Sequence, residues 1–135
     1  MIKEQEFKVP IFNITVLVSL VDDLNDFVKY RQFDWKDVSE FGAYTYSKAG
    51  NRTAITAFGI VFEITSYKKG VLVHETQHLA DYILKYIGDG VNDGNEECRA
   101  YLQQWLFNRI KKIIKHFKND RNRPKKIRKT TTRTK

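Results

Sequence analysis

Cysteine, histidine and long apolar segments are all scarce in this 135-residue chain. The single cysteine, Cys98, excludes a disulfide within the chain and is typical of a reducing compartment. The longest apolar stretch, residues 11–21, is interrupted by polar residues and is too short to span a membrane. Residues 1–10 are charged and lack the apolar centre of a secretory signal. We therefore expect a cytoplasmic protein, or a virion-associated one if a phage encodes it.

Positive charge is concentrated at one end of the chain. Hydrophobic residues make up 41% of the sequence, enough for the core of one domain, which we expect over residues 1–118. Residues 109–135 contain 13 Lys or Arg and one Asp, which leaves a charge of +12. Residues 1–108 contain 11 basic and 15 acidic side chains, a charge of −4. Residues 119–135 have almost no apolar side chains and are predicted to form a flexible basic tail.

Hydrophobic periodicity predicts an α+β fold with the element order β-α-β-β-α-α. Residues 11–21 alternate as a half-buried strand does, and Asp22 or Asp23 can cap the helix that follows. Residues 41–65 are predicted to form a hairpin around the turn Ala49-Gly50-Asn51. Two helices follow, one over residues 71–87 and one that Asn92, Asp93 or Asn95 can cap and that runs to about residue 117. A small twisted sheet of about three strands should therefore pack against the last two helices.

The first of these two helices contains the motif His74-Glu75-Thr76-Gln77-His78. Histidines four residues apart lie one helical turn apart, so both imidazoles can bind one metal ion. Glu75 points about 100° round the helix from His74, toward the place of a metal-bound water. This HExxH arrangement is typical of zinc hydrolases and favours a metallopeptidase. The alternative is that both histidines merely line the solvent face of an amphipathic helix.

A catalytic zinc usually has three protein ligands, so a third ligand must come from outside the motif. Asp81 shares the helix face of the histidines but lies two turns from His74. It is better placed to hold a histidine or a basic group next to the metal ligands. The next helix offers Glu96 and Glu97.

Two segments resemble the motifs of gluzincins, a group of zincin metallopeptidases. Residues 71–80 match the extended HExxH helix, and Glu97-Cys98-Arg99-Ala100-Tyr101 resembles the downstream glutamate signature. The resemblance covers roughly residues 41–108 and implies a minimal, single-domain zincin-like core. In the register of this signature, Glu97 is the third ligand and Glu96 is not. Tyr101 stands where many gluzincins have an aspartate that braces a zinc-bound histidine.

The resemblance implies a zinc-dependent hydrolase of peptide bonds, with a peptide or protein as its substrate. His74, His78 and Glu97 would bind Zn²⁺, and Glu75 would act as the general base. Tyr101 or Tyr82 could donate a hydrogen bond to the substrate oxyanion. Zincins bind their peptide along the sheet edge before the active helix, a role implied here for backbone within residues 53–62.

The basic tail favours an alternative without enzymatic activity. Its cations can neutralise many phosphates, so the chain could be an inactive zincin-like accessory or assembly protein of a phage or mobile element. It would then bind nucleic acid or an acidic protein partner through Arg121, Arg123, Lys125, Lys126, Arg128 and Lys129. No aromatic residue follows Phe117, so the tail should not stack on bases. A solubilising tail and one that docks on a membrane surface are the other interpretations. No sequence feature indicates an oligomeric state.

Overall fold

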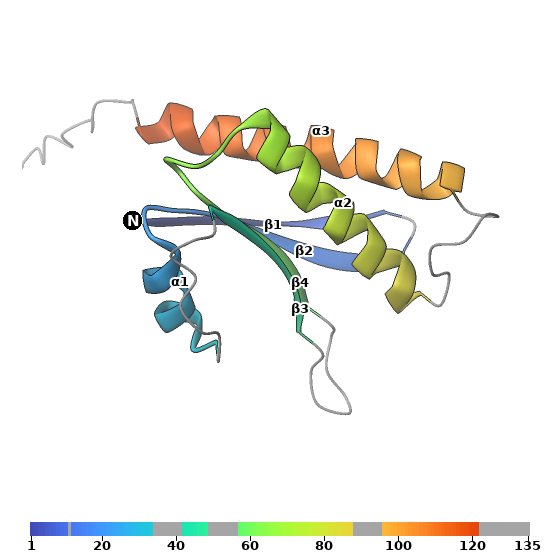
Figure 1. Cartoon of the computed structure of the whole chain (residues 1–135), viewed down its shortest axis with the longest axis horizontal. Helices are drawn as coiled ribbons and strands as arrows, with labels where there is room; N and C mark the ends of the chain where they lie inside the picture. Colours follow the sequence, from blue (N-terminus) through green and yellow to red (C-terminus); the bar gives the residue numbers. More distant parts are fainter. Residues whose placement is uncertain (11, 34–41, 49–56, 88–95, 122–135) are drawn as a thin grey trace, which may run out of the picture.

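The computed structural model describes residues 1–10, 12–33, 42–48, 57–87 and 96–121. Its elements are β1 (Ile2–Val9), β2 (Ile14–Val21), α1 (Leu24–Arg31), β3 (Ala43–Lys48), β4 (Ala57–Glu63), α2 (Lys69–Tyr86) and α3 (Glu96–Arg121). The strands form one mixed sheet of order β1-β2-β4-β3, in which only the β2–β4 pair is parallel. Helices α2 and α3 cover the same face of this sheet (Figure 1). The predicted α+β class is therefore confirmed.

Within the described residues the sheet has four strands, so the prediction of about three strands was wrong. The missing strand is β1, which makes the element order β-β-α-β-β-α-α. Only Phe7 and Val9 of this strand are buried, and Glu4 and Glu6 are among its charged residues. Among the described strands β1 pairs only with β2, so it lies at the sheet edge. A polar edge strand lacks the apolar alternation that marks a buried strand, and the sequence signal was correspondingly weak.

The predicted hairpin is present, because β3 and β4 pair antiparallel from Ala43↔Phe62 to Lys48↔Ala57. Its turn at residues 49–51 lies outside the described residues. For residues 57–62 the implied edge position was wrong, since β4 lies between β2 and β3. The edge beside α2 is β3, and residues 53–56 lie outside the described part.

The helix boundaries follow the predictions with small shifts. Asp23, one of the two predicted caps, accepts a hydrogen bond from the Asn25 backbone N–H at 2.7 Å and begins α1. Helix α2 begins two residues earlier than predicted, at Lys69. Helix α3 continues to Arg121, past the predicted domain boundary at residue 118. No helix within the described residues is long and apolar enough to cross a membrane.

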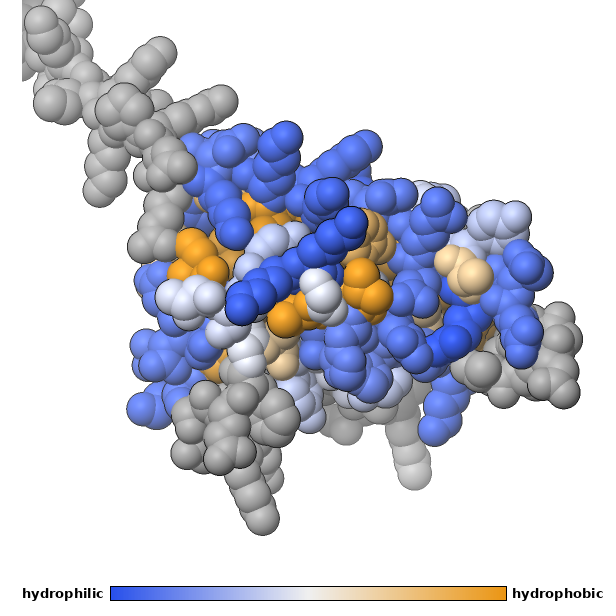
Figure 2. All heavy atoms as spheres, turned by 45° about the horizontal axis from the view of Figure 1, so that its top comes forward, coloured by the Kyte–Doolittle hydropathy of each residue, from blue (hydrophilic) through white to orange (hydrophobic). Residues whose placement is uncertain are grey.

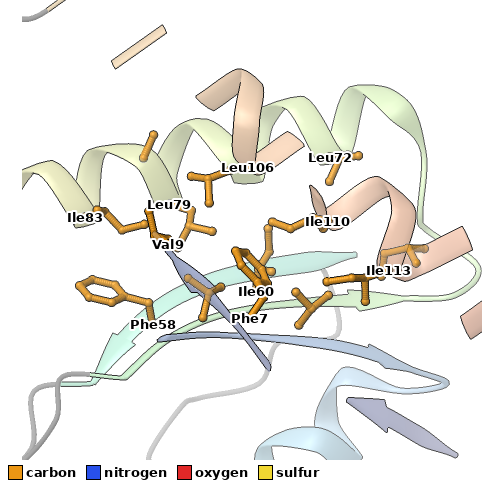
Figure 3. Close-up of a cluster of buried hydrophobic side chains, with 14 of the residues drawn as sticks. Phe7, Val9, Phe58, Ile60, Leu72, Leu79, Ile83, Leu106, Ile110 and Ile113 are labelled. Carbon is orange, nitrogen blue, oxygen red and sulfur yellow. The ribbon is translucent and has the colours of Figure 1, made fainter. Parts of the chain in front are cut away.

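The main core lies between the sheet and the pair α2 and α3 (Figure 3). Alternation along β4 turns Phe58, Ile60 and Phe62 toward the helices, and all three are fully buried. The helices contribute Leu72, Leu79, Ile83, Leu106, Ile110 and Ile113. Each such side chain stabilises the fold by about 1.5–3 kcal/mol through burial. With α3 turned forward, the outer surface is largely hydrophilic with small apolar patches (Figure 2).

The opposite face of the sheet is covered in part by α1. Tyr46 of β3 lies over Gly59 there, because a Cβ at residue 59 would be 2.0 Å from the ring. Burial raises the pKa of Tyr46 to about 12. Arg31 donates a 2.5 Å hydrogen bond to Glu4, which ties α1 to β1. This packing holds β3, the edge strand beside α2, in place.

Candidate metal centre on helix α2

His74 and His78 lie one turn apart on the outer side of α2, and both are exposed. Their Nε2 atoms are 3.1 Å apart, and the rings meet edge to face with centroids 4.7 Å apart. Two nitrogen ligands of a tetrahedral zinc ion, each about 2.0–2.1 Å from it, are about 3.3 Å from each other. The distance between the two nitrogens is therefore close to that between two ligands of one zinc ion. Without a metal, one neutral ring can donate its N–H to the other.

The amphipathic pattern of α2 places the histidines outside. Leu72, Thr76 and Leu79 are buried on the sheet side, and the Thr76 hydroxyl donates to the carbonyl of Leu72 at 2.8 Å. His74 and His78 fall on the opposite side of the helix. Tyr82, one turn beyond His78, stacks on its ring with centroids 6.5 Å apart. Of the two tyrosines proposed as oxyanion donors, Tyr82 is thus the one beside the histidines.

Glu75 lies on the flank of α2 that faces the edge strand β3. Its side chain is only 8% exposed. The hydroxyl of Thr45 lies 2.5 Å from Oε2 of Glu75 and 3.0 Å from its backbone carbonyl oxygen. One hydroxyl proton can serve only one of these acceptors at a time. Thr45 was not among the predicted site residues, because it lies on another element and no local sequence pattern marks this contact.

The other flank of α2 is bound to α3. Asp81 accepts two hydrogen bonds from Arg99, from Nε at 2.5 Å and from Nη2 at 3.3 Å. The hydrogen bond to Asp81 is the main cause of the raised pKa of Arg99. Gln103 of α3 donates to the backbone carbonyl of Val73 at 3.3 Å. Asp81 thus holds a basic group of the next helix, and Arg99 was a partner that the sequence did not reveal.

The structure does not bring Glu97 to the two histidines. Within the described ranges, no three His, Cys, Asp or Glu side chains are grouped closely enough to hold a metal ion. Glu97 is exposed and stands two residues before Arg99, about 200° round α3 from the side that contacts α2. Glu96 lies about 60° from Arg99 and contributes to its raised pKa. The assignment of Glu97 as the third ligand stays a prediction.

Tyr101 also lies away from the histidines. It is 68% exposed and lines a hollow on the far side of α3, together with Val9 and Pro10.

Of the predicted contact residues in the tail, Arg121 ends α3. The others lie outside the described residues, namely Arg123, Lys125, Lys126, Arg128 and Lys129.

No protein-family model matches this sequence, and no curated protein or solved structure is detectably similar to it. The gluzincin resemblance therefore rests on two short motifs. The helical geometry of α2, which brings the two histidines of the first motif together, is the structural observation that bears on it.

Proposed function

We propose that this protein is a zinc-dependent peptide-bond hydrolase of the gluzincin type. The observation that carries the proposal is the 3.1 Å approach of the Nε2 atoms of His74 and His78 on an exposed helix face. Glu75 stands on the adjoining flank of the same helix. A zinc ion at the histidines would supply Lewis acidity and a water of lowered pKa.

The residues of the chain divide the remaining work. His74 and His78 would hold the metal, and Glu97 is proposed as the third ligand. Glu75 accepts a proton from the attacking water and passes it to the leaving amine. The hydroxyl of Thr45 orients the carboxylate of Glu75, since the two are in hydrogen-bond contact. Tyr82 is the proposed donor to the substrate oxyanion, because it lies beside His78.

The edge strand β3 supports an extended peptide as the substrate. Among the described strands, β3 pairs only with β4, and we propose that the substrate pairs with its other edge as an added strand. Thr45 of β3 contacts Glu75, which places this edge next to the proposed base. A peptide bound along β3 would therefore carry its carbonyl groups past the metal site.

Replacement of Glu75 by Gln tests the mechanism. We expect E75Q to retain about one zinc per chain by metal analysis, because Glu75 is not a proposed ligand. Cleavage of a fluorescence-quenched peptide mixture should fall by about 10²–10⁴-fold, because the general base is lost. Gln77→Ala, an exposed position in the same motif, is the matched control and should leave both measurements unchanged. Full activity in E75Q, or a purified protein that binds no zinc, would contradict the proposal.

A second candidate is the non-enzymatic accessory or assembly protein that binds nucleic acid or an acidic partner. The lack of a third grouped ligand within the described residues favours it. This candidate predicts no hydrolysis in the wild-type protein. Deletion of residues 119–135 would then abolish an association that weakens steeply with salt. Salt-independent association would count against it.

A further inference from the structure

Helix α3 borders a hollow that the proposed hydrolase site does not use. Its volume is about 610 Å³, and it lies between the first half of α3 and the segment that joins β1 to β2. Most of the lining is apolar or aromatic, with two amide side chains among it. The lining includes Val9, Pro10, Tyr101, Trp105, Gln104 and Asn108.

A second hollow of about 450 Å³ adjoins the first, because Pro10, Trp105 and Asn108 line both. The second hollow adds three cationic side chains, Lys8, Arg109 and Lys112. All three are exposed. An aromatic hollow and a cationic one therefore meet at Trp105.

The aromatic and cationic groups are held in position by Phe7 of β1. The rings of Phe7 and Trp105 pack with centroids 5.7 Å apart. The guanidinium of Arg109 lies 5.9 Å from the centroid of the same Phe7 ring. Phe7 itself is 5% exposed, whereas Trp105 is 37% exposed. The indole is thus anchored on one side and accessible on another.

We propose that these joined hollows bind single-stranded nucleic acid. A base would stack on Trp105 in the larger hollow, and the adjacent phosphate would contact Lys8, Arg109 and Lys112. The amides of Gln104 and Asn108 offer donors and acceptors to a base edge. The base must be unpaired to enter the hollow, which selects a single strand. The inference does not depend on the hydrolase.

A strand fits better than a free nucleotide because the positive charge continues beyond the hollow. Residues 109–135 carry a charge of +12, and this segment begins at Arg109 inside the site. Further phosphates of a bound strand would meet Lys115, which is exposed and lies about one turn along the helix from Lys112.

Two neighbouring lysines give a matched test of the phosphate contact. Lys112 lines the cationic hollow, whereas Lys111 lies over the ring of Phe107 at 5.7 Å. Binding of a fluorescein-labelled 12-nucleotide thymidine strand to the full chain is measured by anisotropy across salt concentrations. K112Q should raise Kd about threefold and reduce the salt slope by about 0.7, as for one lost phosphate contact. K111Q should change Kd by less than half as much. Equal effects of the two variants would overturn the site.

The stacking contact is tested with Trp105→Leu, which keeps an apolar contact with Phe7. Loss of one stacked base should raise Kd about 10-fold, within the range of single-aromatic substitutions. Trp105→Phe keeps a ring, and its Kd should lie between those of the wild-type protein and W105L. A variant with Trp35→Phe leaves Trp105 as the only tryptophan, and the strand should quench its emission. An unchanged Kd in W105L, or no quenching, would overturn the proposal even if one variant folds poorly.

Competitors separate a strand from other anions. Polyglutamate of equal charge should displace the labelled strand much less effectively than an unlabelled thymidine strand. Thymidine monophosphate at the same nucleotide concentration should also compete weakly. Equal competition by polyglutamate would show a general polyanion surface, and equal competition by the monophosphate would show a mononucleotide site. Either result would overturn the inference.

Discussion

Helices α2 and α3 cover the same face of the sheet, yet their outer sides are built from different interactions (Figure 1). The histidine face of α2 is flanked by hydrogen bonds, from Thr45 to Glu75 and from Arg99 to Asp81. The outer side of α3 is ordered by ring packing, in which Phe7 supports Trp105. Hydrogen bonds fix the position of individual atoms, which general-base chemistry requires. An aromatic platform accepts many orientations of a flat ligand, which suits binding without chemistry.

The two helices also differ in charge. Glu75 and Asp81 place carboxylates on the two flanks of the histidines of α2. Helix α3 changes from acidic at Glu96 and Glu97 to strongly cationic from Arg109 onward. The two proposed functions therefore use separate surfaces. Whether they meet depends on Glu97, the only proposed hydrolase ligand that belongs to α3.

The largest expected effect comes from the pair Glu97→Gln and Glu96→Gln. If Glu97 is the third ligand, E97Q should weaken zinc binding by at least about 100-fold, more than loss of a supporting residue does. E96Q is the matched control, with the same charge change one residue earlier. Zinc affinity is measured by competition with a chelating dye. Loss of zinc in E96Q instead would assign the ligand to the side of α3 that contacts α2.

A smaller effect is expected from Thr45→Val, which removes the hydroxyl and keeps the shape. Because Glu75 would lose the donor that orients it, kcat should fall about 10- to 100-fold while zinc content is unchanged. KM should change little, since the peptide would pair with the backbone of β3 and not with the Thr45 hydroxyl. Thr45→Ser should restore kcat. Thr76→Val, which removes a buried hydroxyl on the sheet-facing side of the same helix, is the control. A parallel loss of kcat in T76V would indicate a general structural effect.

The sequence predicted α2 closely because its information is local. A repeat of apolar residues every three to four positions defines one buried side, and both histidines fall opposite it. The predicted range 71–87 differs from the observed Lys69–Tyr86 by two residues at one end and one at the other. The approach of His74 to His78 follows from the same periodicity.

Contacts between distant elements could not be predicted in this way. Thr45 meets Glu75 only because the β3 edge passes beside α2, a consequence of the strand order. Lys8 and Trp105 line the same hollow because residues 2–9 form the strand β1, which the polar sequence of this segment did not indicate. The sequence predicts no base stacking by the tail, because no aromatic residue follows Phe117. In the structure, Tyr101 and Trp105 of α3 line the larger hollow, and Trp105 also lines the smaller, cationic hollow.

The smallest expected effect concerns the pair that joins the two helices, Arg99 and Asp81. Their side chains are 27% and 32% exposed, so water screens much of their attraction. A double-mutant cycle with R99Q and D81N, followed by urea unfolding, should give a coupling free energy of about 0.5–1 kcal/mol. This coupling should decrease in 1 M salt, because partly exposed ion pairs are screened. A coupling well above this range would mean that the pair locks α3 against α2. Glu97 could then reach the histidines only if α3 rotated as a whole, which would weaken its assignment as a ligand. A small coupling would mean that this ion pair does not oppose the reorientation of the first turn of α3 that the gluzincin assignment requires.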